Sequence, residues 1–196
     1  MTKLISYKIL SKSRFSINGF NMVPLRKEDR FVIMKWRNEQ LYHLRQKKKL
    51  TKKDQDKYFN EVVNELFDKE FPDQLLFSFL DTDKCVGYGG LVHLDWENKN
   101  AEISFVMDTI LEKDNFKNYW RNFLKMIEII AFEELNLNKI YIYSYDLRPK
   151  LYEVTFENSY LLDAKLREHI FYNESFINVN IHSKLNSDYE KNTNSN

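Results

Sequence analysis

A glycine-rich stretch at residues 85–108 constrains the fold more than any other part of the chain. Two apolar runs in it flank the polar segment 97–100, a pattern typical of a β-hairpin. The chain has only four glycines, and three of them, Gly87, Gly89 and Gly90, lie in the first run. Because glycine tolerates a closer backbone approach than other residues, we expect tight backbone contacts on the first strand of this hairpin.

The rest of the sequence predicts strands and helices on both sides of the hairpin. Helical segments have apolar residues at three- and four-residue steps, and strand segments have alternating or continuous apolar residues. The clearest helix, at 116–131, has an aromatic and aliphatic stripe that we assign to the core. In chain order we expect strand 19–25, helix 28–44, helix 51–66, strand 74–80, the hairpin, helix 116–131, strand 139–145, helix 148–158 and a closing hairpin of 166–172 and 176–183.

Length and composition favour one globular domain. The 196 residues are 43% hydrophobic and 15% aromatic, which is enough for a sizeable core. The 30 basic and 29 acidic side chains nearly cancel, so no global field favours nucleic acid or an anionic membrane. A single cysteine excludes an internal disulfide, and no apolar stretch approaches the roughly 20 residues that cross a bilayer. We expect a cytoplasmic domain over 1–185 and a polar, flexible tail over 186–196.

Five short segments carry a resemblance to a known family. They are MVPLR at 22–26, WRN at 36–38, AEISF at 101–105, AFEELNL at 131–137 and LREH at 166–169. In this order the chain resembles the GNAT superfamily of N-acetyltransferases, especially the ribosomal-protein-type enzymes and those that acetylate amino-sugars on nucleotide carriers. The resemblance implies one α/β (α+β) domain with a mixed, mostly antiparallel sheet and helices on both faces. It also implies that strands 102–107 and 139–145 are parallel neighbours that splay apart.

In the resembled fold, this opening receives the pantetheine arm of acetyl-CoA, the expected co-substrate. A backbone N–H of the strand at 103–107 would polarise the thioester carbonyl, and the helix that follows would hold the pyrophosphate at its N-terminus. The cofactor-binding residues implied in this way are Phe105, Val106, Met107, Lys113, Lys117 and Asn118.

Two departures from the family pattern affect this expectation. Segment 109–118 has no glycine where the family has a glycine-containing phosphate loop, although the helix N-terminus still offers donors. The family's usual acid tyrosine falls on Thr155, and Tyr152, one helical turn earlier, is the candidate acid for the departing thiolate. A non-catalytic descendant of the fold that binds a ligand or partner therefore stays open.

Glu102 lies on the strand where family members often place a general base. With a four-residue turn, Asp95 should lie near Glu102 and His93 near Ser104, which also brings His93 close to Glu102. Glu102 would accept a proton from an ammonium group, with help from His93. A simple cross-strand pair between these side chains explains the same pattern equally well.

The acceptor side of the expected cleft is less sharply marked. The basic run at 45–53 borders the acceptor site in the resembled fold, where it would attract a diphosphate, although such runs are usually solvated loops. The candidate acceptor-binding residues are Trp36, Arg37, Asn38, Tyr88 and Trp96, of which Trp36 is equally plausible as core.

We predict an acetyl-CoA-dependent N-acetyltransferase that acts on a primary amine, first of all on a nucleotide-linked amino-sugar used for surface polysaccharide. Alternatives are a protein N-terminus or a small amine as acceptor, and the non-catalytic binding protein. The four histidines show no close-spaced ligand pair, so no metal is expected. A homodimer is a further expectation.

Overall fold

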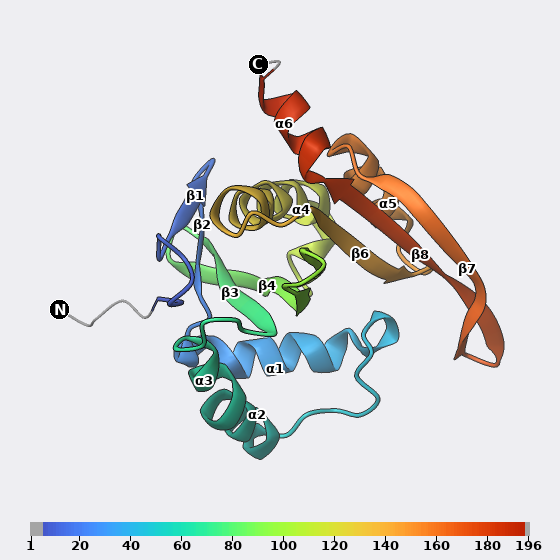
Figure 1. Ribbon diagram of the computed structural model, residues 1–196. Helices are drawn as coiled ribbons and strands as arrows, with labels where there is room; N and C mark the ends of the chain where they lie inside the picture. The colour runs from blue at the N-terminus through green and yellow to red at the C-terminus, as the bar shows by residue number, and fades with distance from the viewer. Residues whose placement is uncertain (1–5, 195–196) are drawn as a thin grey trace.

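The computed structural model describes residues 6–194, with side chains up to residue 191, as one eight-stranded sheet with helices on both faces (Figure 1). The strand order is β1-β2-β3-β4-β5-β6-β8-β7, and the neighbouring strands are antiparallel except for β5 and β6. The strands are β1 (Phe15–Ile17), β2 (Phe20–Pro24), β3 (Gln74–Asp81), β4 (Lys84–Asp95), β5 (Asn100–Met107), β6 (Lys139–Tyr145), β7 (Leu161–Tyr172) and β8 (Ser175–Leu185). The predicted mixed, mostly antiparallel α/β fold is confirmed.

Helices α1 to α3 lie on one face of the sheet and α4 on the other, with α5 beside α4 (Figure 1). The helices are α1 (Arg30–Glu39), α2 (Lys52–Tyr58), α3 (Asn64–Leu66), α4 (Glu112–Glu128), α5 (Pro149–Glu157) and α6 (Asn186–Asn194), with short 3-10 turns at Lys27–Asp29 and Leu41–His43. π-helical segments at Phe59–Val63 and Ile129–Glu134 continue α2 into α3 and extend α4. None of the helices within residues 6–194 is long and apolar enough to cross a membrane.

Three element predictions need correction. The helix predicted for 28–44 ends at Glu39, because the chain leaves the helix at Gln40, whose buried side-chain amide donates to the carbonyl of Met107 in β5. The three-residue edge strand β1 was missed because it is too short to show a period. Residues 186–194, in the segment predicted as a flexible tail, form α6, where the ring of Tyr189 packs 5.1 Å from that of Phe132. The domain boundary at 185 itself stays a prediction.

The hairpin of β4 and β5 forms as predicted, but with a bulge that changes its register. Val92 pairs with Glu102 and Asp95 pairs with Asn100, so that two residues of β4 lie opposite one residue of β5. His93, in the bulge, has a left-handed φ of 51°. The expected pairs of Asp95 with Glu102 and of His93 with Ser104 are wrong because they placed the turn at 97–100. The turn spans residues 96–99, so Asp95 pairs with Asn100, and the bulge then shifts the ladder by one more residue.

Strands β5 and β6 are parallel neighbours joined through α4, as predicted. Their pairing runs from Asn100↔Lys139 to Glu102↔Tyr141, and among the described residues it goes no further, although β5 continues to Met107 and β6 to Tyr145. The two strands therefore part in the middle of the sheet, which confirms the predicted splay.

Aromatic packing between the sheet and α4 fixes this opening. The ring of Phe105 on β5 stacks on Phe123 of α4 at 3.9 Å and meets Trp120 edge-on at 5.0 Å. Phe79 of β3 contacts both Phe105 and Phe123. The stripe on α4 is core, as the sequence predicts, and its burial holds β5 firmly while β6 diverges.

The glycines of β4 test the predicted close approach. A Cβ on Gly89 would lie 2.0 Å from the carbonyl oxygen of Ser104, and one on Gly90 would lie 1.9 Å from that of Leu75. Gly89→Ala and Gly90→Ala should each lower the free energy of unfolding by more than about 4 kcal/mol, since backbone must move. Gly19→Ala is the control: its Cβ would meet nothing within 4 Å, so only its φ of +84° matters, at about 1–2 kcal/mol. Urea unfolding followed by circular dichroism measures all three, and equal losses would contradict the close-approach argument.

Candidate functional site

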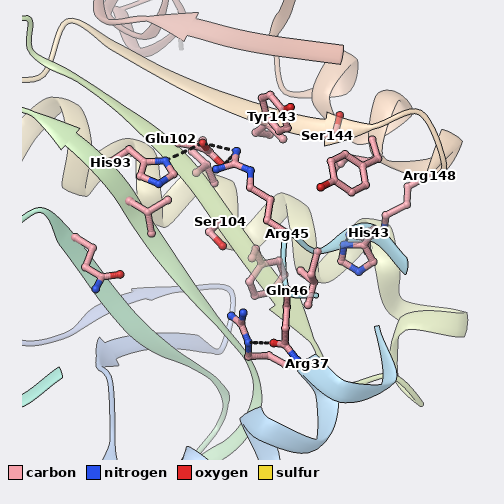
Figure 2. A pocket seen from close by; sticks show the side chains of 18 of the residues that line it. Arg37, His43, Arg45, Gln46, His93, Glu102, Ser104, Tyr143, Ser144 and Arg148 are labelled. Carbon is pink, nitrogen blue, oxygen red and sulfur yellow. Dashed lines mark hydrogen bonds and ion pairs between the residues drawn. The ribbon is translucent and has the colours of Figure 1, made fainter. Parts of the chain in front are cut away.

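A cavity of about 620 Å³ opens where β5 and β6 part (Figure 2). Its wall is built from β4, β5, β6, the start of α5 and the loop that joins the Leu41–His43 turn to α2. Its labelled polar and charged lining residues are Arg37, His43, Arg45, Gln46, His93, Glu102, Ser104, Tyr143, Ser144 and Arg148. A smaller cavity of about 240 Å³ adjoins it and shares Arg37, Leu50, Gln74, Val92 and Ser104.

The parting of the strands leaves one edge of β5 open toward the cavity. The carbonyl of Met107 accepts from Gln40 at 2.8 Å on this edge, while the next N–H, of Asp108, donates to Val86 of β4 at 2.8 Å. Because the backbone groups of a strand alternate in direction, the N–H groups of Phe105 and Met107 lie on the same open edge as the carbonyl of Met107, whereas Ile103 is still within the pairing with β6. These N–H groups are suited to bind an extended ligand or to stabilise a developing oxyanion.

Glu102 lies at the last paired position before this open edge. Its buried carboxylate accepts from the Nη2 of Arg45 at 2.7 Å through both oxygens, and the Nδ1 of His93 lies 3.0 Å from Oε2. The bulge in β4 turns His93 toward Glu102, and its side chain stays 61% exposed. The structure thus brings together the two residues that the sequence proposes as base and helper, while their catalytic roles stay predictions.

Arg45 reaches Glu102 from the loop before α2. Its guanidinium also lies over the ring of Tyr143 on β6, 4.3 Å from the centroid, so it spans the gap between the two diverging strands. Within the predicted basic run, Arg45 lines the cavity, whereas Lys47, Lys48, Lys49, Lys52 and Lys53 are not among its lining residues. Sequence composition marked the run but not which of its members faces the site.

Of the five predicted acceptor-binding residues, two line cavities. The guanidinium of Arg37 lines both cavities, and it donates to the hydroxyl of Tyr88, which lines the smaller one. Trp36 is 3% exposed and belongs to the core. Asn38 braces the loop instead, and Trp96 donates to the carbonyl of Pro72 at 2.9 Å, outside both cavities.

Side chains of α1 hold the loop that carries Arg45. Asn38 accepts from the N–H of Leu50 at 2.7 Å and donates to the carbonyl of the same residue at 2.9 Å. Gln46 accepts from Arg37 at 2.7 Å and donates to Asn38 at 3.1 Å and to the carbonyl of Lys48 at 2.9 Å. The loop is therefore anchored to α1 directly after Arg45, from Gln46 to Leu50.

A third cavity, of about 310 Å³, lies beside the N-terminus of α4. The first-turn N–H groups of Glu112, Lys113 and Asn115 already donate to carbonyls of the preceding 108–111 turn. The positive charge here comes from side chains, since Lys113, Arg148 and Lys150 line this cavity together with Glu112. A phosphate group bound there would be held by these cations in place of a glycine loop.

Arg148 joins the two halves of the site. It is 9% exposed, it pairs with Glu112 of α4, and its Nη1 lies 3.4 Å from the Nδ1 of His43. The other ring nitrogen of His43 lies 3.1 Å from the side-chain oxygen of Gln40. The amide nitrogen of the same Gln40 side chain donates to the carbonyl of Met107. Because Arg148 can only donate, Nδ1 accepts and Nε2 carries the proton. Burial, reinforced by the charge of Arg148, lowers the pKa of His43 to about 3.

Three predicted residues are engaged outside these cavities. Lys117 forms ion pairs with Glu153 and Glu157 of α5, and Asn118 accepts from Asn122 at 3.0 Å. The hydroxyl of Tyr152 donates to Asp146 at 2.8 Å and accepts from Asn180 at 2.9 Å.

Burial, with the hydrogen bond to Asp146, raises the pKa of Tyr152 to about 12. Tyr152 lines neither the 620 Å³ cavity nor the 310 Å³ cavity, and its role as the acid stays a prediction. Val106 and Met107 are buried, as backbone contributors to the β5 edge should be.

Several lining residues were not recognised in the sequence. His43 and Arg148 are far apart along the chain and belong to no motif, and Tyr143 and Ser144 look like ordinary members of an alternating strand. Only the splay of β6 away from β5 turns the latter two toward a cavity. Among the described residues no three histidine, cysteine or acidic side chains gather as a metal site.

Comparison with protein families agrees with this architecture. The family model for the acetyltransferase (GNAT) domain matches residues 2–181. The chain therefore belongs to the GNAT acetyltransferase family. It is an acetyl-CoA-dependent N-acetyltransferase that acts on an amine, and acetyl-CoA is its co-substrate.

Solved structures of similar fold include several of spermidine N-acetyltransferase from Vibrio cholerae. The complex with CoA and spermine has a TM-score of 0.78 and 18% identity, and covers 89% of this chain and 99% of that chain. A structure of mutant forms of the spermidine/spermine N-acetyltransferase has a TM-score of 0.75 and 17% identity, and covers 90% of this chain and 99% of that chain. A dodecameric structure of the enzyme in an intermediate state has a TM-score of 0.74 and 17% identity, and covers 90% of this chain and 99% of that chain. No curated protein matches the chain in sequence.

The lowered pKa of His43 predicts how stability changes with pH. Between pH 6.5 and about 3, the unfolded chain binds a proton at His43 that the folded protein does not. The free energy of unfolding should therefore fall as the pH drops below 6.5, by up to about 1.4 kcal/mol per pH unit from this group. His43→Gln should reduce this slope, as measured by urea unfolding at pH 7, 6 and 5. The contributions of other titrating groups cancel when the slopes of the wild type and the variant are subtracted. Identical slopes in the two proteins would contradict the assignment of this pH dependence to His43.

Proposed function

We propose that the acceptor is the primary amine of a small molecule, bound in the 620 Å³ cavity with its nitrogen beside Glu102. The observation that carries this proposal is the position of Glu102, a buried carboxylate that lines the cavity at the last paired residue before the open edge of β5. An amine at this position meets a proton acceptor and, next to it, the free N–H groups of the strand.

The proposed reaction moves the acetyl group from sulfur to nitrogen. The substrate ammonium first gives a proton to Glu102, directly or through water, and becomes a neutral amine. The C–N bond forms while the C–S bond breaks, and the N–H of Phe105 or Met107 stabilises the charge on the thioester oxygen. The thiolate takes the second amine proton, which yields the amide and the free thiol, and Glu102 releases its proton to water.

The residues around the 310 Å³ cavity fit the phosphates of acetyl-CoA. Three cationic side chains line it, Lys113, Arg148 and Lys150, and the ion pair with Arg148 offsets the negative charge of Glu112. These cations would supply the attraction that the family usually draws from a glycine loop. The predicted cofactor contacts of Lys117 and Asn118 have less support, because both side chains have partners elsewhere.

Two kinds of acceptor have separate support. The similar solved structures are spermidine enzymes, which favours the small-amine alternative of the sequence analysis over a nucleotide-linked amino-sugar. The cavity itself favours an acceptor that bears negative charge, because its basic residues outnumber its acidic ones, Glu102 and Asp73. A nucleotide-linked amino-sugar is one such acceptor and stays a second candidate.

We also infer a cytoplasmic protein that associates with copies of itself. The nearly balanced charge supports a protein that binds neither nucleic acid nor membranes. Self-association, predicted as a homodimer, has support from the edge strand β7, where the side chains of Leu161 and Leu162 are exposed.

Glu102→Gln should lower kcat by roughly 10²–10⁴-fold, the range typical for loss of a general base. Glutamine keeps the shape of the side chain, so the fold and acetyl-CoA binding should be preserved. Glu97→Gln, an exposed change in the turn of the same hairpin, is the matched control and should leave kcat unaltered. Steady-state rates with acetyl-CoA and a panel of amines measure both. An unchanged kcat for Glu102→Gln would remove this residue from its role.

Lys113→Ala and Lys150→Ala should each raise the KM for acetyl-CoA about fivefold, the effect of losing about 1 kcal/mol of charge attraction. Their kcat values should stay near that of the wild type, because these side chains lie away from Glu102. Lys125→Ala, exposed on the same helix α4, is the control. Isothermal titration with acetyl-CoA checks the binding directly. Affinities equal to that of the control would place the phosphates elsewhere.

A further inference from the structure

The strongest unexplained feature of the site is that its proposed base already has a cationic partner. The Nη2 of Arg45 donates to both carboxylate oxygens of Glu102 at 2.7 Å. An incoming ammonium needs one of these oxygens, and it brings a second positive charge to the same carboxylate. Like charges this close repel each other, so a simple polyamine would bind against Arg45.

The side chain of Arg45 is exposed, although its loop is anchored. It is 46% exposed, whereas Glu102 is 10% exposed. The neighbouring Gln46 is joined to α1 by hydrogen bonds to Arg37 and Asn38. The described contacts of the Arg45 guanidinium are Glu102 and the ring of Tyr143, both of which line the cavity, so a ligand in the cavity can reach the guanidinium.

The charges around the cavity define what would draw Arg45 away. Besides Arg45, the cationic side chains that line the cavity are Arg37 and Arg148. Arg37 and Arg148 are engaged by Tyr88 and Gln46, and by Glu112. Arg45 is therefore the exposed guanidinium nearest to Glu102, and an anion on the acceptor would bind it in bidentate geometry.

We propose that the acceptor carries an anionic group, a carboxylate or phosphate, on the same molecule as its amine, and that Arg45 exchanges Glu102 for this group. The inference rests on the proposed function and specifies its substrate class. On binding, one internal ion pair is replaced by two intermolecular ones, ammonium to Glu102 and anion to Arg45. The exchange frees Glu102 to accept the proton only when the correct acceptor is present, so Arg45 determines specificity.

Matched pairs of amines test this proposal. Putrescine and 4-aminobutyrate differ by an ammonium against a carboxylate, and glucosamine and glucosamine 6-phosphate differ by the phosphate. The wild type should favour the anionic member of at least one pair by about tenfold or more in kcat/KM. The pair that shows the preference distinguishes a carboxylate from a phosphate as the source of the anion.

The variants assign this preference to Arg45. Arg45→Ala should lower kcat/KM for the anionic member about tenfold or more while the other member is unchanged or improves, and Arg45→Lys should restore part of the preference. Arg14→Ala, the same change at a position outside the cavities, is the control and should match the wild type. A wild type without preference, or a preference that persists in Arg45→Ala, overturns the proposal.

Binding measured without turnover separates this inference from the proposed function. Thermal shifts of the wild type and Arg45→Ala with each of the four amines report anion recognition alone. Acetylation without an Arg45-dependent preference would leave the proposed function standing and reject the inference. An Arg45-dependent binding preference without acetylation of any amine would reject the proposed function and leave anion recognition by Arg45 standing.

Discussion

The parallel pairing of β5 and β6 ends after Glu102 and Tyr141, and the whole site depends on this early end. Beyond it, β5 is held by the stacking of Phe105 on Phe123, while β6 follows its antiparallel partner β8. The gap exposes polar backbone groups that would be costly if they were buried without partners. Gln40 satisfies one of them, the carbonyl of Met107, and the remaining N–H groups are available to a substrate.

Electrostatics then divides the opening into two regions. At one end, Glu102 is held by Arg45 and His93, which fix the orientation of its carboxylate. At the other end, cationic side chains surround the first turn of α4, and Glu112 is neutralised by Arg148. The ring of His43 lies between these two regions and is hydrogen-bonded to Gln40. It stays neutral because burial lowers its pKa. Proton transfer and phosphate attraction can thus occur in one cleft with different charge environments.

Solved structures of similar fold share the scaffold of this chain but little of its sequence. The V. cholerae structures cover nearly the same architecture at 16–18% identity, a level at which the fold is shared but the side chains of a pocket are largely independent. In this chain the loop before α2 places the guanidinium of Arg45 on the carboxylate of Glu102. In our proposal this loop selects the acceptor, while the sheet provides the groups for acetyl transfer.

The sequence by itself determined the order of elements, the stripe of α4, the parallel pair β5–β6 and the place of Glu102 beside His93, because local periodicity and glycine placement, together with the family resemblance, specify these directly. The close approach at Gly89 and Gly90 was also predictable, since glycine was used there and almost nowhere else. The register near His93 could not be predicted, because a bulge depends on how both strands pack. Only the tertiary structure decided that Arg45 faces Glu102 and that Arg148 meets His43. Both contacts join segments far apart in the chain, and their geometry follows from the packing of the sheet and helices that lie between them.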